Sequence, residues 1–485
     1  MRPRGYTVGI SGRPSRSAPA APASRGNAPP PVVTAAGDGR LPRQLGFWST
    51  TALTVGFIIG VGIFRAPSAV AADAGSVGRV ALVWTAGGLI ALCGALSIAE
   101  LGAMFPRAGG IYVHLREAYG PLVAFLYGWT ALATGSASFG VLALVFAEYL
   151  GTFVPLTASG ARAVAAGTVL AVAAASYRST RGASALQGTA TAAKVLALAA
   201  IVVLAFALGG GAAEGALAGS STAARLAAAD AVAHPGWDRL GVALIAALWP
   251  YSGWHYPALM AGEVRDPART FPRAVITGVM TVLVLYLAVN AAYLHVLPLP
   301  TLAQSPLAAA DVMRRVLGPI GSATVSALIM VSAFGTLTAG LLAVPRLYYA
   351  MAEDGLFFRR LAGVHPRFRT PHAAVTFLAL ATLTLAVLLG LDQLRELLVV
   401  GAWPFLTLAV LAVPVLRRRR PELPRPYRMP GSPLVPLVFL AASLALIGSA
   451  VVEHPRQTLA TFGFTLLGVP AYVAWRAAGR RRAVA

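Results

Sequence analysis

Twelve long apolar runs constrain this chain more than any other feature of its sequence. Each is about as long as a membrane-spanning helix, which needs roughly 20 mostly apolar residues. The runs lie at about 48–72, 79–104, 119–151, 161–177, 185–208, 238–262, 272–297, 320–351, 372–390, 396–416, 432–452 and 458–478. Only 12% of the 485 residues are charged, against about a quarter in soluble domains. We therefore predict an all-α polytopic membrane protein with twelve transmembrane helices in a lipid bilayer.

The arginines predict the orientation of these helices. With the N-terminus in the cytoplasm, 28 arginines fall on the inner side and eight in outer loops, while Arg65 and Arg346 lie within or at the ends of spans. Because basic residues concentrate in cytoplasmic loops, we expect both termini to be cytoplasmic. The heavy use of Ala, Gly and Arg is typical of a GC-rich bacterial genome, so the expected location is the cell (inner) membrane. Basic loops beside anionic lipid account for the net charge of +22 without nucleic acid as a partner.

Other features exclude several classes of protein. The single cysteine, Cys93, lies inside an apolar run, so an intrachain disulfide, a multi-cysteine metal cluster and a disulfide-linked partner subunit are not expected. We find no nucleotide-binding loop, no histidines spaced for a metal and no nucleophile–base pair, so we expect no enzyme, cofactor or metal site. A channel would need a polar or charged pore lining, which is not apparent.

The first run contains a signal for a helix break at mid-membrane, because Gly60-Val61-Gly62 falls near its middle. Glycine permits backbone conformations that other residues resist. An opened membrane helix exposes N–H and C=O groups, which must line a cavity or meet a ligand. Close packing of helices against small residues would explain the glycines equally well.

The sixth run is interrupted as well. Pro250 removes a backbone donor, Ser252 and Gly253 follow it, and aromatic residues such as Trp249 and Tyr251 crowd the site. Two broken spans that lie five spans apart indicate an inverted repeat, and in transporters such breaks surround the central binding site. Half-helix N-termini suit a carboxylate, and free carbonyls suit an ammonium group. Since no acidic residue adjoins either break, the pattern favours a zwitterion with a neutral side chain, that is, a neutral amino acid.

Several motifs resemble those of the amino acid–polyamine–organocation superfamily. They are, in chain order, "GFIIGVGIF", "AELGAMFPRAGGIYVHLREAYG", "GWHYPALMAGEVRDPARTFPRA", "AMAEDGLFFRRLAGVHPRFRTP" and "RRRRPELPRPYRMPGSPLVP". The resemblance spans about residues 45–478 and is strongest to L-type and basic or neutral amino acid permeases. It implies a LeuT-type fold of two inverted five-helix repeats plus two C-terminal helices. The expected segments are a disordered cytoplasmic tail (1–44), a first repeat (45–208), an outer loop (209–237), a second repeat (238–416), a basic inner loop (417–431), two helices (432–478) and a cytoplasmic tail (479–485).

The resemblance also implies roles for individual residues. The substrate carboxylate would meet Ile59, Gly60, Val61 and Gly62; its amine and backbone would meet Tyr251, Ser252 and Gly253. Trp249 takes the position of an aromatic gate over the substrate, although a packed membrane aromatic would explain it too. The family often has a small polar residue where this chain has Val61, so only the backbone can serve there. Further pocket candidates are Phe334, Gly335 and Trp403.

Lys194 is the only lysine beside 38 arginines, and it lies in the apolar run 185–208. Nine residues at 1.5 Å each place it about 14 Å into the helix, deeper than a residue that snorkels from a helix end. In relatives a lysine here fills the place of a bound sodium ion, facing carbonyls of the first break and hydroxyls such as that of Ser332. A buried lysine can lose its proton, so a proton is a possible co-substrate.

The sequence thus predicts a permease that moves neutral L-amino acids by alternating access, with a buried lysine in place of the coupling sodium. Uniport, exchange and proton symport all stay open. A cationic amino acid or polyamine exchanger of the same fold is the alternative, but it would want a carboxylate facing the pocket. A channel or a membrane-embedded enzyme is a remote alternative.

Overall fold

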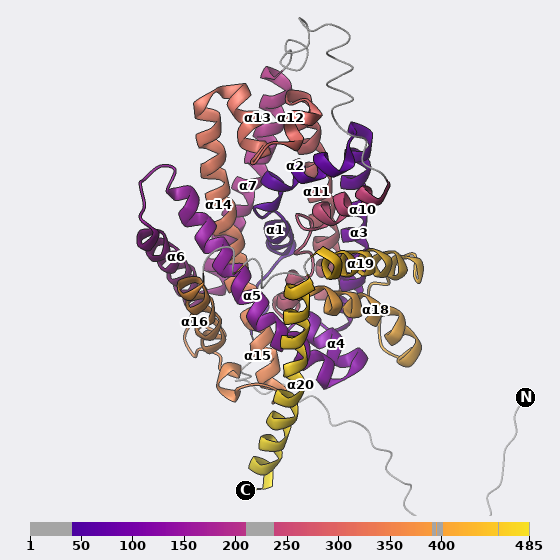
Figure 1. Ribbon diagram of the computed structural model, residues 1–485. Helices are drawn as coiled ribbons and strands as arrows, with labels where there is room; N and C mark the ends of the chain where they lie inside the picture. Colours follow the sequence, from indigo (N-terminus) through magenta and orange to yellow (C-terminus); the bar gives the residue numbers. More distant parts are fainter. Residues whose placement is uncertain (1–40, 210–236, 390–393, 395–400, 454, 485) are drawn as a thin grey trace, which may run out of the picture. The chain divides into compact units, whose positions relative to one another are not determined.

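The computed structural model describes residues 41–209, 237–389, 394, 401–453 and 455–484, and these residues are folded into helices (Figure 1). Among them the strand-like pairing is a single isolated bridge between Leu45 and Val264. Within the described part of the chain, eight helices are long and apolar enough to cross a membrane. They are α3 (Val77–Met104), α5 (Pro121–Leu150), α6 (Ala158–Arg178), α7 (Thr180–Leu208), α11 (Pro267–Val296), α14 (Pro319–Ala343) continued by α15 (Pro345–Glu353), α19 (Leu434–Glu453) and α20 (Pro455–Val484). The prediction of an all-α multi-pass membrane protein is confirmed.

The remaining apolar runs hold broken or shorter helices. The first run holds two helices, α1 (Phe47–Ile58) and α2 (Gly62–Ala74), with a bend of 47° between their axes. Counted as one broken helix, they make a ninth span. The sixth run holds α10 (Trp237–Leu248) and the 3₁₀ helix η1 (Tyr256–Glu263). Two more runs hold α16 (His372–Leu388) and α18 (Trp403–Arg419). The number twelve therefore remains a prediction.

Four further short helices join these elements. They are α4 (Ile111–Tyr119), α12 (Leu299–Ala303), α13 (Ala308–Leu317) and the 3₁₀ helix η2 (Arg359–Ala362). Parts of the predicted segments lie outside the described residues: 1–40 of the first tail, 210–236 of the outer loop, 390–393 and 395–400 of the second repeat, 454 between the last two runs, and 485. Helix α20 continues through Val484, across most of the segment predicted as a C-terminal tail.

Side-chain caps explain where several helices begin. Ser76 accepts a hydrogen bond from the amide of Arg79 at the start of α3, and Ser179 accepts one from the amide of Gly182 at the start of α7 (2.9 Å). Such caps satisfy amide groups that have no partner within the helix.

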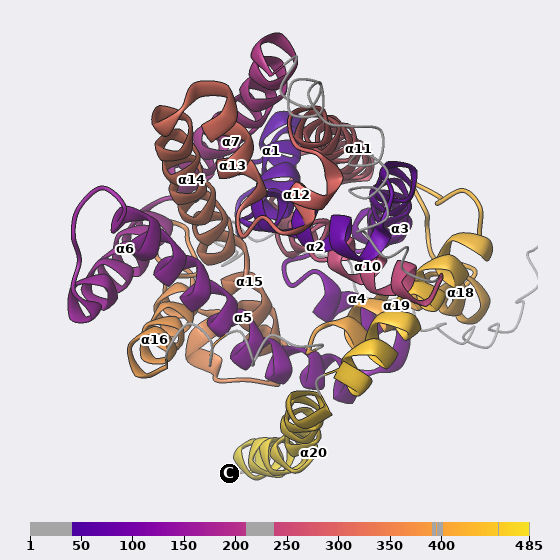
Figure 2. The ribbon, with the colours of Figure 1, turned by 45° about the horizontal axis from the view of Figure 1, so that its top comes forward.

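Helix α1 lies among α7, α11 and α14 and contacts all three (Figures 1 and 2). Its buried face includes Thr54, Val55 and Gly56, and few of its side chains reach the surface. The far end of α1 and the start of α2 therefore lie inside the protein, where α10 and η1 also meet them. This packing brings the two interrupted runs together.

Candidate functional site

The first helix opens where the sequence predicts it. Helix α1 ends at Ile58 and α2 begins at Gly62, after the amide of Gly60 has turned back to the carbonyl of Ile58 (2.8 Å). The last carbonyls of α1 and the first amides of α2 thus lack their usual helical partners. Buried backbone groups need other partners, and the neighbouring helices supply several of them.

Lys194 supplies a charged donor to two of these carbonyls. Its ammonium donates to the carbonyl oxygens of Gly56 (3.2 Å) and Ile59 (2.8 Å) and to Oγ1 of Thr336 (2.8 Å). An ammonium group has three donors, so these three acceptors are a complete set. The side chain is only 3% exposed, which excludes snorkelling to the membrane surface. The lysine and the break in the first span are therefore one structural unit.

Two glycines make room for this unit. A Cβ atom at Gly335 would come within 2.9 Å of Lys194 Cε and of Ala190 Cβ. A Cβ atom at Gly56 would overlap the side chains of Gln187 and Thr191. Gly335, expected as a pocket residue, therefore contacts the lysine rather than the cavity. Gly56 allows α7 to approach α1 closely enough for the ammonium to reach its carbonyls.

The hydroxyl that meets the ammonium belongs to Thr336, which the sequence reading missed. Ser332 instead donates to the carbonyl of Gly60 (2.9 Å) and, at 3.4 Å, to that of Ile59. The two hydroxyls lie one turn apart on the same face of α14, so sequence spacing alone does not distinguish them. Ser332 is thus corrected from a direct partner of Lys194 to a partner of the same broken backbone.

The second break touches the first. Between α10 and η1, Gly253 adopts φ +108°, a conformation that favours glycine. A Cβ atom there would lie 2.7 Å from the carbonyl oxygen of Phe57. On the other side, a Cβ atom at Gly62 would lie 3.0 Å from Cα of Pro250. Both glycines therefore bring the backbones of the two broken runs into direct contact.

A cavity of about 250 Å³ lies at this junction. Its lining comes from both breaks and from α5, α14, α15 and α18. The lining residues that the sequence predicted are Gly60, Val61, Gly62, Trp249, Ser252, Gly253 and Trp403. No Asp, Glu, Lys or Arg is among the described lining residues, and His255 is the one histidine. The cavity can therefore offer backbone dipoles and aromatic faces, but no fixed charge.

The backbone at this cavity offers both signs of partial charge. Gly62, the first residue of α2, lines the cavity, so the positive end of that helix faces it. Phe57 lines it too, and none of the hydrogen bonds among the described residues ends at its carbonyl. By contrast, Tyr286 donates to the carbonyls of Ile58 (3.2 Å) and Pro250 (3.3 Å). The amides at the start of α2 and the carbonyl of Phe57 thus belong to residues that line the same small cavity.

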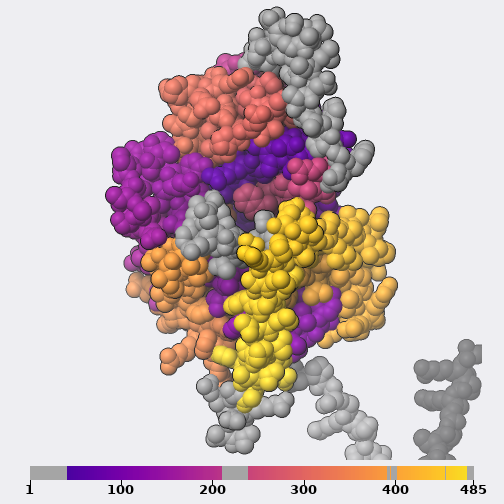
Figure 3. Space-filling model, in the orientation of Figure 1, coloured from indigo at the N-terminus to yellow at the C-terminus, as the bar shows by residue number. Residues whose placement is uncertain are grey.

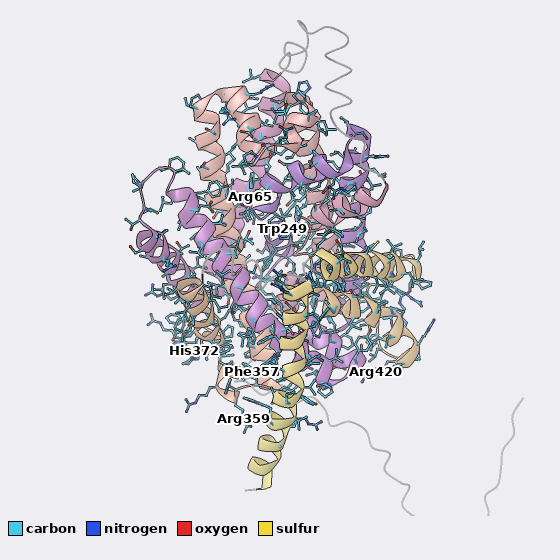
Figure 4. All side chains as sticks on the ribbon, viewed as in Figure 1. Arg65, Trp249, Phe357, Arg359, His372 and Arg420 are labelled. Atoms are coloured by element: carbon cyan, nitrogen blue, oxygen red, sulfur yellow. The ribbon has the colours of Figure 1, made fainter. Side chains whose placement is uncertain are left out.

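Trp249 lines the cavity at the end of α10, and its side chain is labelled in Figure 4. It is 54% exposed, so it is not a packed core aromatic. In the space-filling view, α2 and α10 lie between the orange surface of α13 and α14 and the yellow C-terminal helices (Figure 3).

Arg65 on α2, also labelled in Figure 4, donates to the hydroxyl of Tyr149 (3.3 Å).

Three predicted residues point elsewhere. Tyr251 is 1% exposed, and its ring packs against Trp84 and Tyr286 rather than into the cavity. Phe334 lines a separate apolar pocket between α5 and α14, where it faces Phe146. Ile59 is fully buried and contributes its carbonyl to Lys194.

A buried ion pair lies at the end of η1. Glu263 and Arg346 are both fully buried, with Oε1 of the glutamate 2.7 Å from Nε of the arginine. Arg346 also donates to Oγ1 of Thr180 (3.1 Å), at the start of α7. The carbonyl of Glu263 accepts hydrogen bonds from the amides of Gln44 and Leu45, just before α1. Four parts of the chain are therefore joined here, although the sequence indicated only that Arg346 lies at the end of a span.

Comparisons with known proteins identify relatives of this chain. A family model described as amino acid permease matches residues 45–470. The serine/threonine exchanger SteT of Bacillus subtilis is 31% identical over 444 residues, which cover 90% of this chain and 97% of that protein. The mouse b(0,+)-type amino acid transporter 1 is 30% identical, over 86% of this chain and 84% of the transporter. The human cystine/glutamate transporter is also 30% identical, over 89% of this chain and 85% of that protein.

Proposed function

Because the chain belongs to the amino acid permease family of the amino acid–polyamine–organocation superfamily, we propose that it is a secondary transporter of neutral L-amino acids. The observation that carries this proposal is the uncharged cavity at the meeting point of two broken helices. There the N-terminal amides of α2 would hold the substrate carboxylate, and the carbonyl of Phe57 would hold the amine. A zwitterion with a neutral side chain needs no further charge.

Lys194 takes the place of a coupling cation in this proposal. Its ammonium holds the carbonyls of Gly56 and Ile59, as a bound metal ion would hold backbone oxygens. Three acceptors satisfy all three of its donors, and this favours a lysine that stays charged during transport. We therefore propose exchange of internal for external amino acid rather than proton symport. Two of the relatives are named as an exchanger and as a transporter of cystine and glutamate.

The proposed architecture is that of twelve spans in two inverted repeats of five, followed by α19 and α20. The eight long helices and the bent pair α1–α2 would be nine of these spans, and α10 with η1, α16 and α18 would be the others. Both breaks would then occupy equivalent first positions of the two repeats. Alternating access would move these repeats about the cavity, in a cell membrane with both termini on the inner side.

The first test is an uptake panel of labelled amino acids with the purified protein in proteoliposomes. We expect saturable uptake of neutral amino acids, acceleration by internal amino acid, and no response to sodium or to a pH gradient. Uptake confined to lysine, arginine or polyamines would favour the cationic alternative. Uptake that needs an inward proton gradient would contradict exchange with a charged lysine.

The second test places a side chain in the cavity itself. A Cβ atom at Gly60 would meet only Oγ1 of Thr336, at 4.0 Å, so Gly60→Val should fold normally. It should nevertheless weaken substrate binding at least tenfold, because the added methyl groups occupy the space of the substrate. The control is Gly167→Val on α6, where the position is open and remote from the cavity. Unchanged substrate affinity in Gly60→Val would place the binding site elsewhere.

A further inference from the structure

A second cavity lies on the surface formed by α4, α18 and α19, away from the amino acid site. It has a volume of about 640 Å³, within the range of ligand-binding pockets. Figures 1 and 2 both show α18 beside α19 and α4, and each pair with α18 is in contact. The cavity therefore lies among three helices of one compact part of the chain.

One face of α18 is apolar along this cavity and ends in positive charge. Leu408, Leu411 and Val415 line it at helical spacing, and Arg418 and Arg419 follow on the last turn. Across the groove, Leu437 of α19 is 51% exposed. Bulk water would be an unfavourable neighbour for such a surface, and lipid chains would be a favourable one.

The four consecutive arginines at the end of α18 have different partners. Arg417 pairs with the carboxylate of Glu100, and Arg420 pairs with that of Glu117 at 2.9 Å. Figure 4 labels Arg420 at this end of the molecule. Arg419 donates to the carbonyl of Ala118 at 3.4 Å, which leaves its charge uncompensated. For Arg418, the interactions of the described residues include neither a hydrogen bond nor a carboxylate partner. Two positive charges thus stand at the mouth of the apolar groove.

We propose that this groove binds an anionic phospholipid. One acyl chain would lie along Leu408, Leu411 and Leu437, and the phosphate would accept hydrogen bonds from Arg418 and Arg419. Basic pockets at the inner ends of membrane helices suit anionic headgroups, and arginine matches the geometry of a phosphate. The same groove would not suit a soluble anion, because the arginines hold only the headgroup while the apolar lining holds the chain.

The test titrates phosphatidylglycerol into the full-length protein in a neutral detergent and follows the unfolding temperature. Phosphatidylcholine, with the same acyl chains, and inorganic phosphate are run in parallel. We expect phosphatidylglycerol to raise the unfolding temperature of the parent well above the effect of the other two. Arg418→Gln and Arg419→Gln should each raise the half-saturating lipid concentration about fivefold, and the double variant should raise it roughly 20- to 30-fold.

The matched control is Arg360→Gln, which removes another exposed arginine from a basic segment remote from the groove. It should bind phosphatidylglycerol as the parent does. Leu411→Trp fills the groove and keeps both arginines, so it should also weaken binding at least fivefold. The proposal is overturned if the double variant stays within twofold of Arg360→Gln. It is also overturned if phosphatidylcholine or inorganic phosphate stabilises the parent as much as phosphatidylglycerol does.

Discussion

Lys194 is the residue on which the opened first helix depends. Without its ammonium, the carbonyls of Gly56 and Ile59 would lose their charged donor and keep only longer contacts with hydroxyls of α14. A buried carbonyl left unsatisfied costs about 1–3 kcal/mol. We therefore expect Lys194→Ala to reduce exchange in proteoliposomes to background and to lower the unfolding temperature. Lys194→Arg should not restore exchange, because the larger guanidinium does not fit the space beside Gly335. An alanine variant that exchanges at the parent rate would show that the ammonium is dispensable.

Gly335 offers a test of the same site without a change in charge. The methyl group of Gly335→Ala would lie 2.9 Å from both Lys194 Cε and Ala190 Cβ. Because the Cβ atom of Ala190 cannot turn aside, α7 must move away from α14 at this point. Lys194 moves with α7, so its short hydrogen bonds should lengthen. Exchange should fall at least tenfold, as measured by initial rates of labelled substrate uptake.

The control for this substitution is Gly188→Ala on α7, where a Cβ atom would meet nothing within 4 Å. That variant should exchange at the parent rate and unfold at the same temperature or slightly above it, because alanine favours a helix over glycine. Equal exchange by the two variants would mean that the position of the ammonium does not limit transport.

The sequence predicted the types of residue at the site better than their directions. Some site residues could be identified because they are unusual in an apolar membrane helix. Gly60 and Gly253 make the backbone flexible there, and Lys194 places a charge there. The choice between Ser332 and Thr336 depends on how α14 rotates against α1, which the spacing of two hydroxyls on one face does not determine. The direction of the Tyr251 side chain could not be predicted either, because it depends on how the chain between α10 and η1 is turned. The ring packs against Trp84 and Tyr286, although its neighbours in sequence line the cavity.

At the scale of elements, the end of α10 is where we expect movement. Trp249 has more than half of its side chain exposed, so Trp249→Ala should cost little stability. If the ring closes over the substrate, its loss should slow exchange several-fold while equilibrium binding of the substrate changes less. The two quantities are measured by initial rates in proteoliposomes and by titration of the purified protein. A loss of affinity as large as the loss of rate would make Trp249 a binding residue rather than a gate.

Long elements could be predicted from hydropathy, and short ones could not. The bounds of α3, α7 and α11 agree with the apolar runs to within five residues, because these helices contain continuous apolar stretches. The run at 119–151 agrees as well, because Gly120 ends α4 with φ +93° and α5 spans Pro121–Leu150. Helices α12 and α13 lie in a segment with no long apolar run, so hydropathy gave no signal for them.

At the scale of the whole molecule, ion pairs join distant parts of the chain. Glu263 and Arg346 connect the end of the second broken run to α15, to the start of α7 and to the segment before α1. Glu100 of α3 similarly pairs with Arg417 of α18 (2.5 Å) and accepts from the amide of Met429. Such pairs would have to separate if the parts they join move apart during alternating access.

Loss of one partner of the buried pair should be costly. Arg346→Met leaves the fully buried carboxylate of Glu263 without its guanidinium, which typically costs about 3–5 kcal/mol. Glu263→Met/Arg346→Met removes both charges and should be more stable than the single variant, because two apolar side chains can pack together. Arg314→Met is the control, since the side chain of this arginine is 63% exposed in its pair with Asp311, and a pair with an exposed partner should contribute less than about 1 kcal/mol. Unfolding temperatures in detergent measure all three.

The double variant also tests whether the pair keeps the inner end of the cavity closed. Leu347 lines the cavity next to Arg346 and is 1% exposed, so a cysteine placed there reports access to it. In a Cys93→Ser background, an impermeant thiol reagent should label Leu347→Cys slowly in the parent from either side of the membrane. If the pair holds the inner end shut, the double variant should label several-fold faster from the inner side and at an unchanged rate from the outer side. Equal labelling of the two proteins from the inner side would mean that this pair stabilises the packed helices without controlling access. The contact that closes the cavity would then lie elsewhere along η1 and α15.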